Sequence, residues 1–285
     1  MSSVCILTDN TAQFTKGLFP GRDLVTCINL QILGDLAPEE SQEQMAKSLP
    51  PSVRNGTAPK LAIPTAEDYR QMFLRLGQDY NEVVAICHSS YLSRAYENVL
   101  EAAESVRGRV SVQPIDSQTT SVGLGFLVQA AAEAAANDSP STEIERLLRG
   151  LIPHIYSIFC IPSLTYLHQA GFLGQAQALV GEMLGLLPLF SLEDGHLTPL
   201  EKVRNSRQLL DFLQEFLDEF SDLYQIAVIQ SIPPMTHEAK TLKEHAATNF
   251  PKTPFTEVTI SLPLATLFGP RSMGVFAIEI PDSRE

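Results

Sequence analysis

Cysteine, basic residues and long apolar runs are all scarce in this sequence. The four cysteines lie far apart and form no C-x-x-C pair, which argues against a metal or redox site built on cysteine. Each lies in an apolar, strand-like run, so we expect reduced thiols in the core at Cys5, Cys27, Cys87 and Cys160. Lys and Arg number 20 against 33 Asp and Glu, and this net charge of −13 argues against a surface for nucleic acid or anionic membranes.

No apolar run approaches the roughly 20 residues that a membrane-spanning helix needs. The N-terminal residues 1–4 show no basic segment followed by an apolar one, so no export signal is visible and we expect a cytoplasmic protein. The apolar fraction of 44% and the charged fraction of 19% are typical of a globular chain rather than a disordered one. At 285 residues the chain is long enough for two domains or one large domain.

Familiar catalytic motifs are also missing. The sequence has no G-x-S-x-G, no G-x-x-x-x-G-K-[ST] and no G-x-G-x-x-G, and its six histidines show no H-x-x-x-H spacing or nearby carboxylate. Cys87 and His88 cannot form a dyad, because adjacent strand residues point to opposite faces. Gly123 and Gly125 lie in an Ala-rich helical stretch and indicate close helix packing. We therefore expect no metal and no cofactor, and a binding protein rather than an enzyme.

The most informative stretch is a strand, a hydroxyl-rich turn and a helix over residues 83–107. Residues 83–87 are apolar and largely β-branched, which predicts a buried strand, and helical spacing begins at Ser93. Such a turn places backbone N–H groups and hydroxyls at the positive end of a helix, where a carboxylate, a phosphate or a carbonyl oxygen can bind. The simpler interpretation is a capped helix start with Ser90 or Ser93 as N-cap. Likewise, residues 9–11 could cap a helix after the first strand.

Local signals predict three further elements in the first half of the chain. Residues 24–33 form a second β-prone run, and Pro38 with the two acidic residues after it predicts a helix start. Thr65 as N-cap and Asp68 three residues later predict a helix that begins with a capping box.

Strands and helices alternate through the first half of the chain, which predicts a parallel sheet covered on both faces. Ligands of such sheets lie beyond the carboxyl ends of the strands, where the turns at Thr8, at 89–93 and at 116–117 fall. The second half predicts another α/β unit containing a hairpin around Asp194-Gly195. The fold class is therefore α/β with two domains, residues 1–152 and 153–285, and a cleft between them.

Taken together, these segments resemble the DegV family. The similarity extends over the whole chain and rests on order and spacing rather than on one strong motif. The matching segments are Thr8-Asp9-Asn10, residues 89–96, Asp116-Ser117, residues 164–167 with Gly171, residues 186–189, Asp194-Gly195, Lys202-Val203-Arg204 and Gly269-Pro270. Family members with an assigned role are bacterial fatty-acid-binding proteins that present the acyl carboxylate to a fatty-acid kinase. The resemblance implies two α/β units with a lipid tunnel through the second and the head group at their interface.

The chain departs from the family pattern at four segments. The family's Thr-Ser-Gln-Pro is Leu61-Ala62-Ile63-Pro64, which loses a head-group hydroxyl. Ser-Gly-Thr is Ser93-Arg94-Ala95, which keeps Ser93, the expected carboxylate donor. Gly-Gly-Arg is Ala170-Gly171-Phe172, and His-x-Gly-Pro-Gly is residues 267–271, with Leu267 in place of the histidine and Phe268 beside it. Ser90, Ser93 and the helix N-terminus are the expected polar contacts, and Leu61, Ala62, Phe172, Leu267 and Phe268 their apolar surroundings.

Two interpretations of these departures remain open. In the first, Arg94 and Arg271, both at positions that are glycine in the family, grip the carboxylate of an acyl chain. In the second, the ligand is less polar, such as an ester, an alcohol or an isoprenoid, and is held by buried area at about 0.8 kcal/mol per CH₂. Both arginines could also simply face solvent.

Two further functions compete with the lipid carrier. Lys202 and Arg204 keep the basic spot of the family, so a protein with a closed cavity could still bind a partner such as a fatty-acid kinase. Alternatively, Ser93 could act as a hydrolase nucleophile with His88 or His168.

Overall fold

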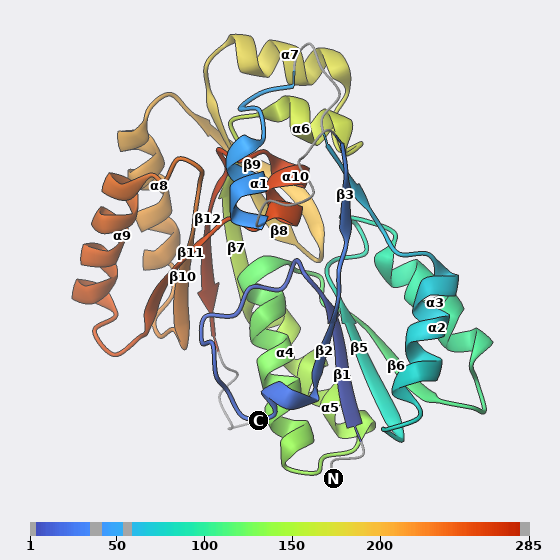
Figure 1. The fold of residues 1–285 in the computed structure, drawn as a ribbon. Coiled ribbons are helices and arrows are strands. Elements are labelled where there is room, and N and C mark those ends of the chain that lie inside the picture. The colour runs from blue at the N-terminus through green and yellow to red at the C-terminus, as the bar shows by residue number, and fades with distance from the viewer. Residues whose placement is uncertain (1–3, 35–41, 54–58, 280–285) are drawn as a thin grey trace.

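The computed structural model describes residues 4–34, 42–53 and 59–279. Two separate sheets dominate it and lie side by side in Figure 1. The first has four parallel strands in the order β2-β1-β5-β6. Their bounds are Val4–Asp9 for β1, Val25–Ile28 for β2, Glu82–Cys87 for β5 and Ser111–Asp116 for β6. As expected for a parallel sheet, β1 and most of β5 are apolar and buried on both faces.

Two pairs of helices cover the first sheet. Alternate residues of β1 and β5 point to opposite sides, so Cys5 and Leu7 pack toward one pair while Val4 and Ile6 pack toward the other. The outer pair is α2 (Ala66–Leu76) and α3 (Ala95–Ser105), and the inner pair is α4 (Ser121–Ala136) and α5 (Ser141–Leu151). Thr65 and Asp68 form the expected capping box of α2, with Asp68 Oδ2 accepting from the Thr65 amide at 2.8 Å.

Helix α4 lies between the two sheets (Figure 1). Its residues 121–128 are buried on every side, as expected for a helix segment that is apolar nearly all round, and it contacts β1 and β5 on one side and β12 on the other. Gly125 permits a close approach: a Cβ atom there would lie 2.1 Å from the Gln13 carbonyl oxygen. The close packing predicted for this stretch is therefore confirmed.

The second sheet has six strands in the order β11-β10-β12-β7-β8-β9. Only the β10–β11 pair is parallel, and the other described pairs are antiparallel. The bounds are Ile155–Cys160 for β7, Leu187–Glu193 for β8, His196–Val203 for β9, Gln225–Gln230 for β10, Phe255–Thr259 for β11 and Met273–Ile278 for β12. Helices α8 (Ser206–Asp218) and α9 (Thr236–Asn249) cover its outer face, and the predicted hairpin is β8–β9.

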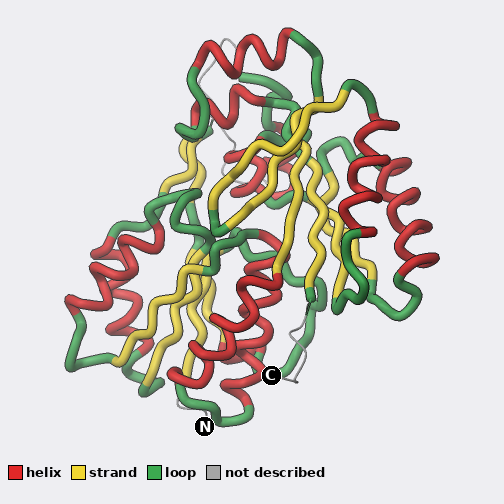
Figure 2. Tube along the Cα trace, turned by 180° about the vertical axis from the view of Figure 1, so that it is seen from behind, coloured by secondary structure: helices red, strands yellow, loops and turns green. Residues whose placement is uncertain are grey.

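A cap of short elements closes the end of the molecule toward which the carboxyl ends of the first sheet point (Figures 1 and 2). It contains four short helices and a two-stranded ribbon. These are α1 (Gln42–Ser48), α6 (Leu164–Gln169), α7 (Gln175–Met183), α10 (Leu262–Phe268), β3 (Gln31–Leu33) and β4 (Lys60–Ala62). Helix α10 is completely buried and contacts α1, α6 and β4.

Three expectations from the sequence are wrong. Residues 9–11 cap no helix, because the Asp9 side chain binds Thr11 and a distant histidine, and the next helical element is a 3₁₀ turn over Arg22–Leu24. Cys27 is exposed, since β2 is an edge strand, whereas the other three thiols are buried. The predicted strand 24–33 is divided into β2 and β3, which belong to different sheets. The helix start predicted at Pro38 lies outside the described residues.

Candidate functional site

The carboxyl ends of the parallel strands bring together side chains that are distant in sequence. Asp9 ends β1, His88 follows β5 directly, and Asp116 ends β6. Because parallel strands end at one edge of the sheet, these groups meet there, as the sequence pattern predicted. The Ser90 amide donates to Asp116 Oδ1 at 3.1 Å, and this bond fixes the turn after β5 against its neighbour.

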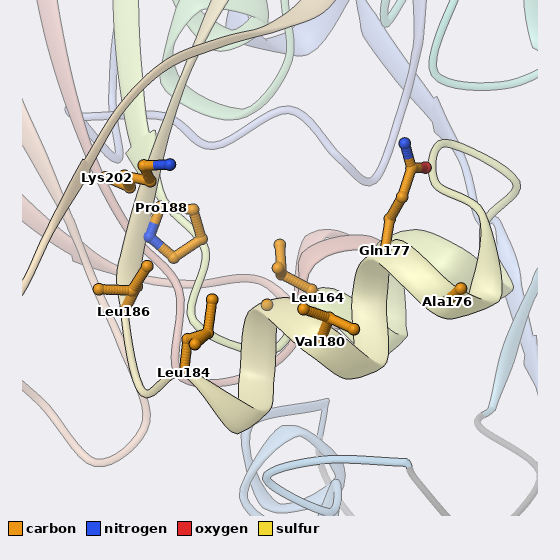
Figure 3. Close-up of a pocket in the computed structure, with 9 residues that line it drawn as sticks. Leu164, Ala176, Gln177, Val180, Leu184, Leu186, Pro188 and Lys202 are labelled. Carbon is orange, nitrogen blue, oxygen red and sulfur yellow. The ribbon is translucent and has the colours of Figure 1, made fainter.

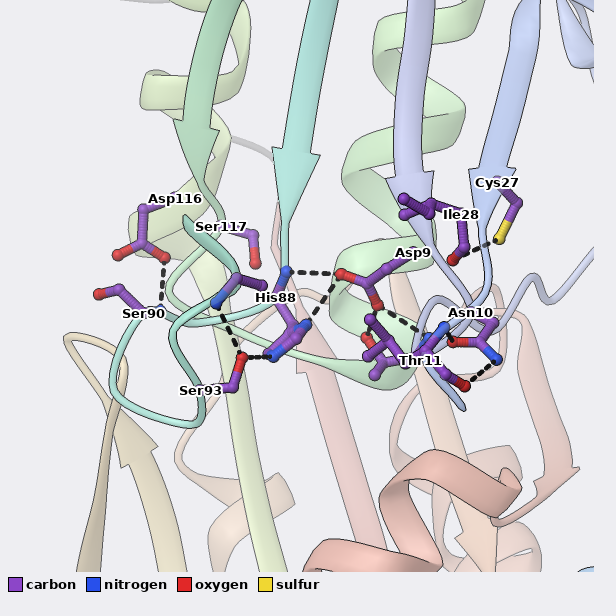
Figure 4. A network of polar contacts seen from close by, with 12 residues as sticks. Asp9, Asn10, Thr11, Cys27, Ile28, His88, Ser90, Ser93, Asp116 and Ser117 are labelled. Atoms are coloured by element: carbon purple, nitrogen blue, oxygen red, sulfur yellow. Dashed lines mark hydrogen bonds and ion pairs between the residues drawn. The ribbon is translucent and has the colours of Figure 1, made fainter. Parts of the chain in front are cut away.

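A continuous chain of hydrogen bonds runs from Asp9 through His88 to Ser93 (Figure 4). His88 Nδ1 lies 2.8 Å from Asp9 Oδ2, and His88 Nε2 lies 2.5 Å from Ser93 Oγ. His88 and Asp9 are fully buried, with 0% and 1% of their surface exposed, whereas Ser93 is half-buried. The chain therefore begins in the core and ends at the surface of the site.

Asp9 is held as a carboxylate by four donors. Its Oδ1 accepts from the Thr11 amide at 2.9 Å and the Thr11 hydroxyl at 2.5 Å, while Oδ2 accepts from the amide and the ring of His88. Burial alone would raise the pKa of the Asp9 carboxyl. The attraction of His88 and the hydrogen bonds from His88 and Thr11 outweigh burial and hold this pKa below its usual range.

The start of α3 differs from the prediction. Its N-cap is Arg94, whose side chain makes no capping bond, and neither Ser90 nor Ser93 is the N-cap. Ser93 nevertheless satisfies one amide at the start of α3, because its Oγ accepts a hydrogen bond from the Ala95 amide at 3.1 Å. The Ser93 oxygen thus lies between the first amide of α3 and the His88 ring.

Ser93 opens onto a small pocket of about 240 Å³ between the turn after β5 and the cap elements β4, α6 and α10. The pocket unites four residues that the sequence had placed in one site, namely Leu61, Ser93, Arg94 and Leu267. Its remaining lining residues are Pro59, Lys60, Ile63, Leu92, Gln169, Ala170 and Thr266. Ser93 is thus surrounded largely by apolar side chains.

The Arg94 guanidinium lies at the rim. Its Nε donates to Glu97 Oε2 at 2.8 Å, and the two side chains are 81% and 56% exposed. Arg94 therefore lines the pocket while its charge is paired on the surface.

The other predicted site residues do not line this pocket. Ser90 is occupied with Asp116 through its amide, and Arg271 is exposed. Phe172 packs against the large core cluster, Phe268 is fully buried beside Phe159, and Ala62 is half-buried on β4.

Lys202 lies at a second, larger groove of about 510 Å³ between α7 and β8 (Figure 3). The groove is mostly apolar, and Val180 and Leu184 of its lining are exposed. Arg204 is exposed but does not line it. The predicted basic spot therefore borders an apolar surface.

Among the described residues, no group of three His, Cys, Asp or Glu side chains is placed to hold a metal ion. No helix in the described part of the chain is long and apolar enough to cross a membrane.

The whole described chain, and not the site alone, matches one protein family. The model of the DegV family, described as uncharacterised proteins, matches residues 3–279. The chain belongs to the DegV family. A DegV domain-containing protein of Streptomyces coelicolor is 30% identical over 217 residues, which are 74% of this chain and 75% of that one. The DegV protein of Bacillus subtilis is 25% identical over 281 residues. The matched part is 96% of this chain and 98% of the Bacillus protein.

Solved DegV structures have the same fold. A fatty-acid-binding DegV protein of Streptococcus agalactiae superposes with a TM-score of 0.83 at 19% identity, covering 98% of this chain and 100% of its own. The fatty acid kinase B3 protein of Streptococcus pneumoniae, loaded with linoleic acid, superposes with a TM-score of 0.80 at 16% identity. The superposition covers 98% of this chain and 99% of the Streptococcus pneumoniae protein. The family resemblance inferred from the sequence is confirmed.

The Asp9–His88 pair was not predicted, because the two residues lie 79 positions apart and no carboxylate is close to His88 along the chain. One signal was available: both residues stand at carboxyl ends of predicted parallel strands, which adjoin in the sheet.

Proposed function

We propose that this protein binds a fatty acid, with the carboxyl group at Ser93 in the pocket beside α3, and carries it as a DegV-type lipid carrier. The observation that supports this most directly is the position of Ser93. Its hydroxyl is held by His88 and the Ala95 amide, and it opens onto an apolar pocket at a helix N-terminus, where the helix dipole favours negative charge. Relatives of the same fold are described as fatty-acid-binding proteins.

The acyl chain extends from this pocket between the cap and the second sheet, through a lipid tunnel. The pocket alone is smaller than the roughly 300 to 1,000 Å³ of typical ligand sites, so it takes the head group and the first part of the chain. Beyond it lie α10 and the aromatic group of Phe159, Phe268 and Phe276, which supply apolar surface. In this proposal residues 1–152 carry the head-group turn and residues 153–285 form most of the tunnel, with the head group in the cleft between them.

The head-group site is a remodelled, less polar version of the family site. Leu61 and Leu267 line it in place of polar groups, so besides Ser93 and the α3 amides the charged donors of the lining are Lys60 and Arg94, which are exposed. An unpaired buried carboxylate costs several kcal/mol. A neutral lipid, such as an alcohol, ester or isoprenoid, is the alternative cargo that this lining favours.

Native mass spectrometry of the purified protein tests the proposal. We expect a mass increase equal to one fatty acid, either co-purified or retained after incubation with palmitate. The absence of any retained fatty acid would contradict the proposal, and retention of a fatty alcohol alone would favour the neutral cargo.

Ser93→Ala is expected to weaken fatty-acid binding about five- to tenfold, because it removes a hydrogen bond worth about 1 kcal/mol. The measurement is titration with a fluorescent fatty acid. Ser105→Ala is the matched control: Ser105 donates to the Ala102 carbonyl at the far end of α3, and its loss should leave the affinity unchanged.

Arg94→Ala is expected to weaken fatty-acid binding by no more than about fivefold, the range of an exposed ion pair. Binding of a fatty alcohol should be unaffected. Competition titrations with both lipids measure this, and an equal loss for both would mean that Arg94 acts through packing instead of charge.

Presentation of the cargo to a partner belongs to the same proposal. Lys202 and Arg204 supply positive charge beside the groove between α7 and β8, whose exposed Val180 and Leu184 offer an apolar contact. A partner protein, such as a fatty-acid kinase, would dock there. In the alternative where the cavity is closed, docking at this surface would be the sole function.

A further inference from the structure

The hydrogen bonds around Ser93 leave the site one proton short of what a carboxylate needs. Asp9 accepts from four donors and has a lowered pKa, so it is an ionised acceptor. His88 Nδ1, facing Asp9 Oδ2 at 2.8 Å, must therefore carry a hydrogen. In a neutral imidazole the other nitrogen is then a bare acceptor.

The Ser93 hydroxyl has a single hydrogen, and it donates this hydrogen to His88 Nε2. With Nε2 2.5 Å from Ser93 Oγ, the hydroxyl donates to the ring. Ser93 Oγ also accepts from the Ala95 amide. In this state Ser93 shows the pocket a lone pair and no hydrogen, so a carboxylate placed there would meet another acceptor.

A proton added to the system removes the conflict in two equivalent ways. If His88 takes it, Nε2–H donates to Ser93 Oγ, and the Ser93 hydroxyl is free to donate to the ligand carboxylate. If the ligand keeps it, the carboxylic acid donates to the Ser93 lone pair. Both bound states hold one proton more than the free carboxylate and the neutral site.

We propose that binding of a carboxylate at Ser93 is coupled to the uptake of one proton by the Asp9–His88–Ser93 chain, with His88 as the positioning residue. This inference rests on the proposed fatty-acid binding. The charge of the ligand then affects its binding. An alcohol can donate its own hydroxyl hydrogen to Ser93, so it binds with no uptake of a proton from solution.

The titratable thiols and phenols around Asp9 and His88 carry no charge at pH 7, so Asp9 is the group that would compensate the positive charge of a protonated His88. Burial, then the Asp9 charge, raises the pKa of the Cys87 thiol on β5, and desolvation, then Asp9, raises the pKa of Cys27 on β2 to about 11. Desolvation likewise raises the pKa of Tyr69 on α2 and of Tyr96 on α3. These four groups stay neutral at pH 7. Asp116 at the end of β6 is the other carboxyl nearby, bound to the amides of residues 90 and 118.

Two other accounts of the site make different predictions. Lys60 and Arg94 line the rim and could neutralise a carboxylate with no proton uptake. The hydrogen bonds from Asp9 through His88 to Ser93 also have the arrangement of a serine hydrolase triad, in which Ser93 would be the nucleophile.

The first test is calorimetric titration of palmitate, delivered from cyclodextrin, in buffers of different ionisation enthalpy at pH 7 to 8. We expect uptake of about one proton per palmitate and a Kd that rises roughly tenfold for each unit of pH. Hexadecanol should show neither effect. Palmitate binding with no net proton uptake would overturn the coupling but keep the proposed function, whereas no binding at all would overturn the proposed function.

The second test reads the ring directly by NMR of protein with ¹⁵N-labelled histidine. The free protein should show His88 as the Nδ1–H tautomer, and the palmitate complex should show hydrogens on both nitrogens or an unchanged ring with a protonated ligand carboxyl. His88→Gln assigns the signal. An Nε2–H tautomer in the free protein would overturn the inference.

Asp9→Asn gives a sharper variant. Thr11 donates twice to Oδ1, so the amide oxygen of Asn takes that place and its NH₂ faces the His88 ring, at the loss of the longer hydrogen bond of 3.3 Å from the His88 amide. His88 then becomes the Nε2–H tautomer, Ser93 is free to donate, and proton uptake should fall to near zero. His245→Gln, which removes the surface pair of His245 with Asp218 across α8 and α9, is the matched control and should keep full uptake.

If Asp9→Asn does not fold, the titrations and spectra of the unaltered protein decide the question. Covalent labelling of Ser93 by a fluorophosphonate, lost in Ser93→Ala, would replace the positioning role of His88 by a catalytic one and overturn the inference.

Discussion

Asp9→Ala is expected to lower the free energy of unfolding by about 3 to 5 kcal/mol, the loss typical of breaking one side of a buried charged network. The change leaves His88 Nδ1 and both Thr11 donors without their acceptor in the core. Urea unfolding followed by circular dichroism measures it. Asp116→Ala is the matched control: it removes a half-buried carboxylate at the next strand end, bound to two backbone amides, and should cost about 1 to 2 kcal/mol.

The same carboxyl makes the protein sensitive to acid. The folded-state pKa of Asp9 is lowered, so its contribution to stability is complete above the ordinary Asp pKa of about 3.9 and is lost as the pH falls through the lowered folded value. We therefore expect the unfolding midpoint in urea to fall more steeply below about pH 4 in the unaltered protein than in Asp9→Asn. Equal pH dependence of the two would mean that other carboxyls govern acid unfolding.

Ala170→Phe is expected to reduce fatty-acid affinity by more than about a hundredfold. Ala170 is half-buried, lines the pocket beside Ser93 and has ordinary helical backbone angles, so a larger side chain there fills the pocket without backbone strain. Excluding about four methylenes at 0.8 kcal/mol each costs about 3 kcal/mol of binding. Retention of palmitate in native mass spectrometry and fluorescent titration measure the loss.

Ala176→Phe is the control for this experiment. Ala176 is exposed and lines the other apolar groove, between α7 and β8. If the acyl chain enters beside Ser93, Ala176→Phe binds palmitate as the unaltered protein does. Loss of binding in Ala176→Phe with retention in Ala170→Phe would move the cargo to the α7 groove.

Much of the fold could be predicted from local sequence, because periodicity and turn residues act over short distances. The apolar run of β5, the Thr65–Asp68 capping box and the Asp194-Gly195 hairpin each carry their own signal, and each is observed. Helix α10 went unpredicted. All seven of its residues are buried and all but Thr266 are apolar or proline, so it lacks the alternation that marks an amphipathic helix.

The site was predictable only in part, for a physical reason. Leu61, Ser93, Arg94 and Leu267 were placed together by the family resemblance, and the pocket does unite them. His88 was considered as a partner of Ser93 only in the hydrolase alternative, and its own partner Asp9 was missed, because the pairing of β1 with β5 in the sheet brings the two together across 79 residues of sequence. Phe172 and Arg271 were placed by the same resemblance, which carries no information on side-chain direction.

The shared position of α4 limits how cargo can be exchanged. A hinge that separated the sheets would break the contact between α4 and β12 and expose that apolar side of α4 to water. Loading and unloading must therefore leave this wall intact. In the cap, α7 has one buried residue, Ala178, and lies between Gly174 and Gly185, so its displacement would admit a lipid at a smaller loss of buried area than displacement of the fully buried α10.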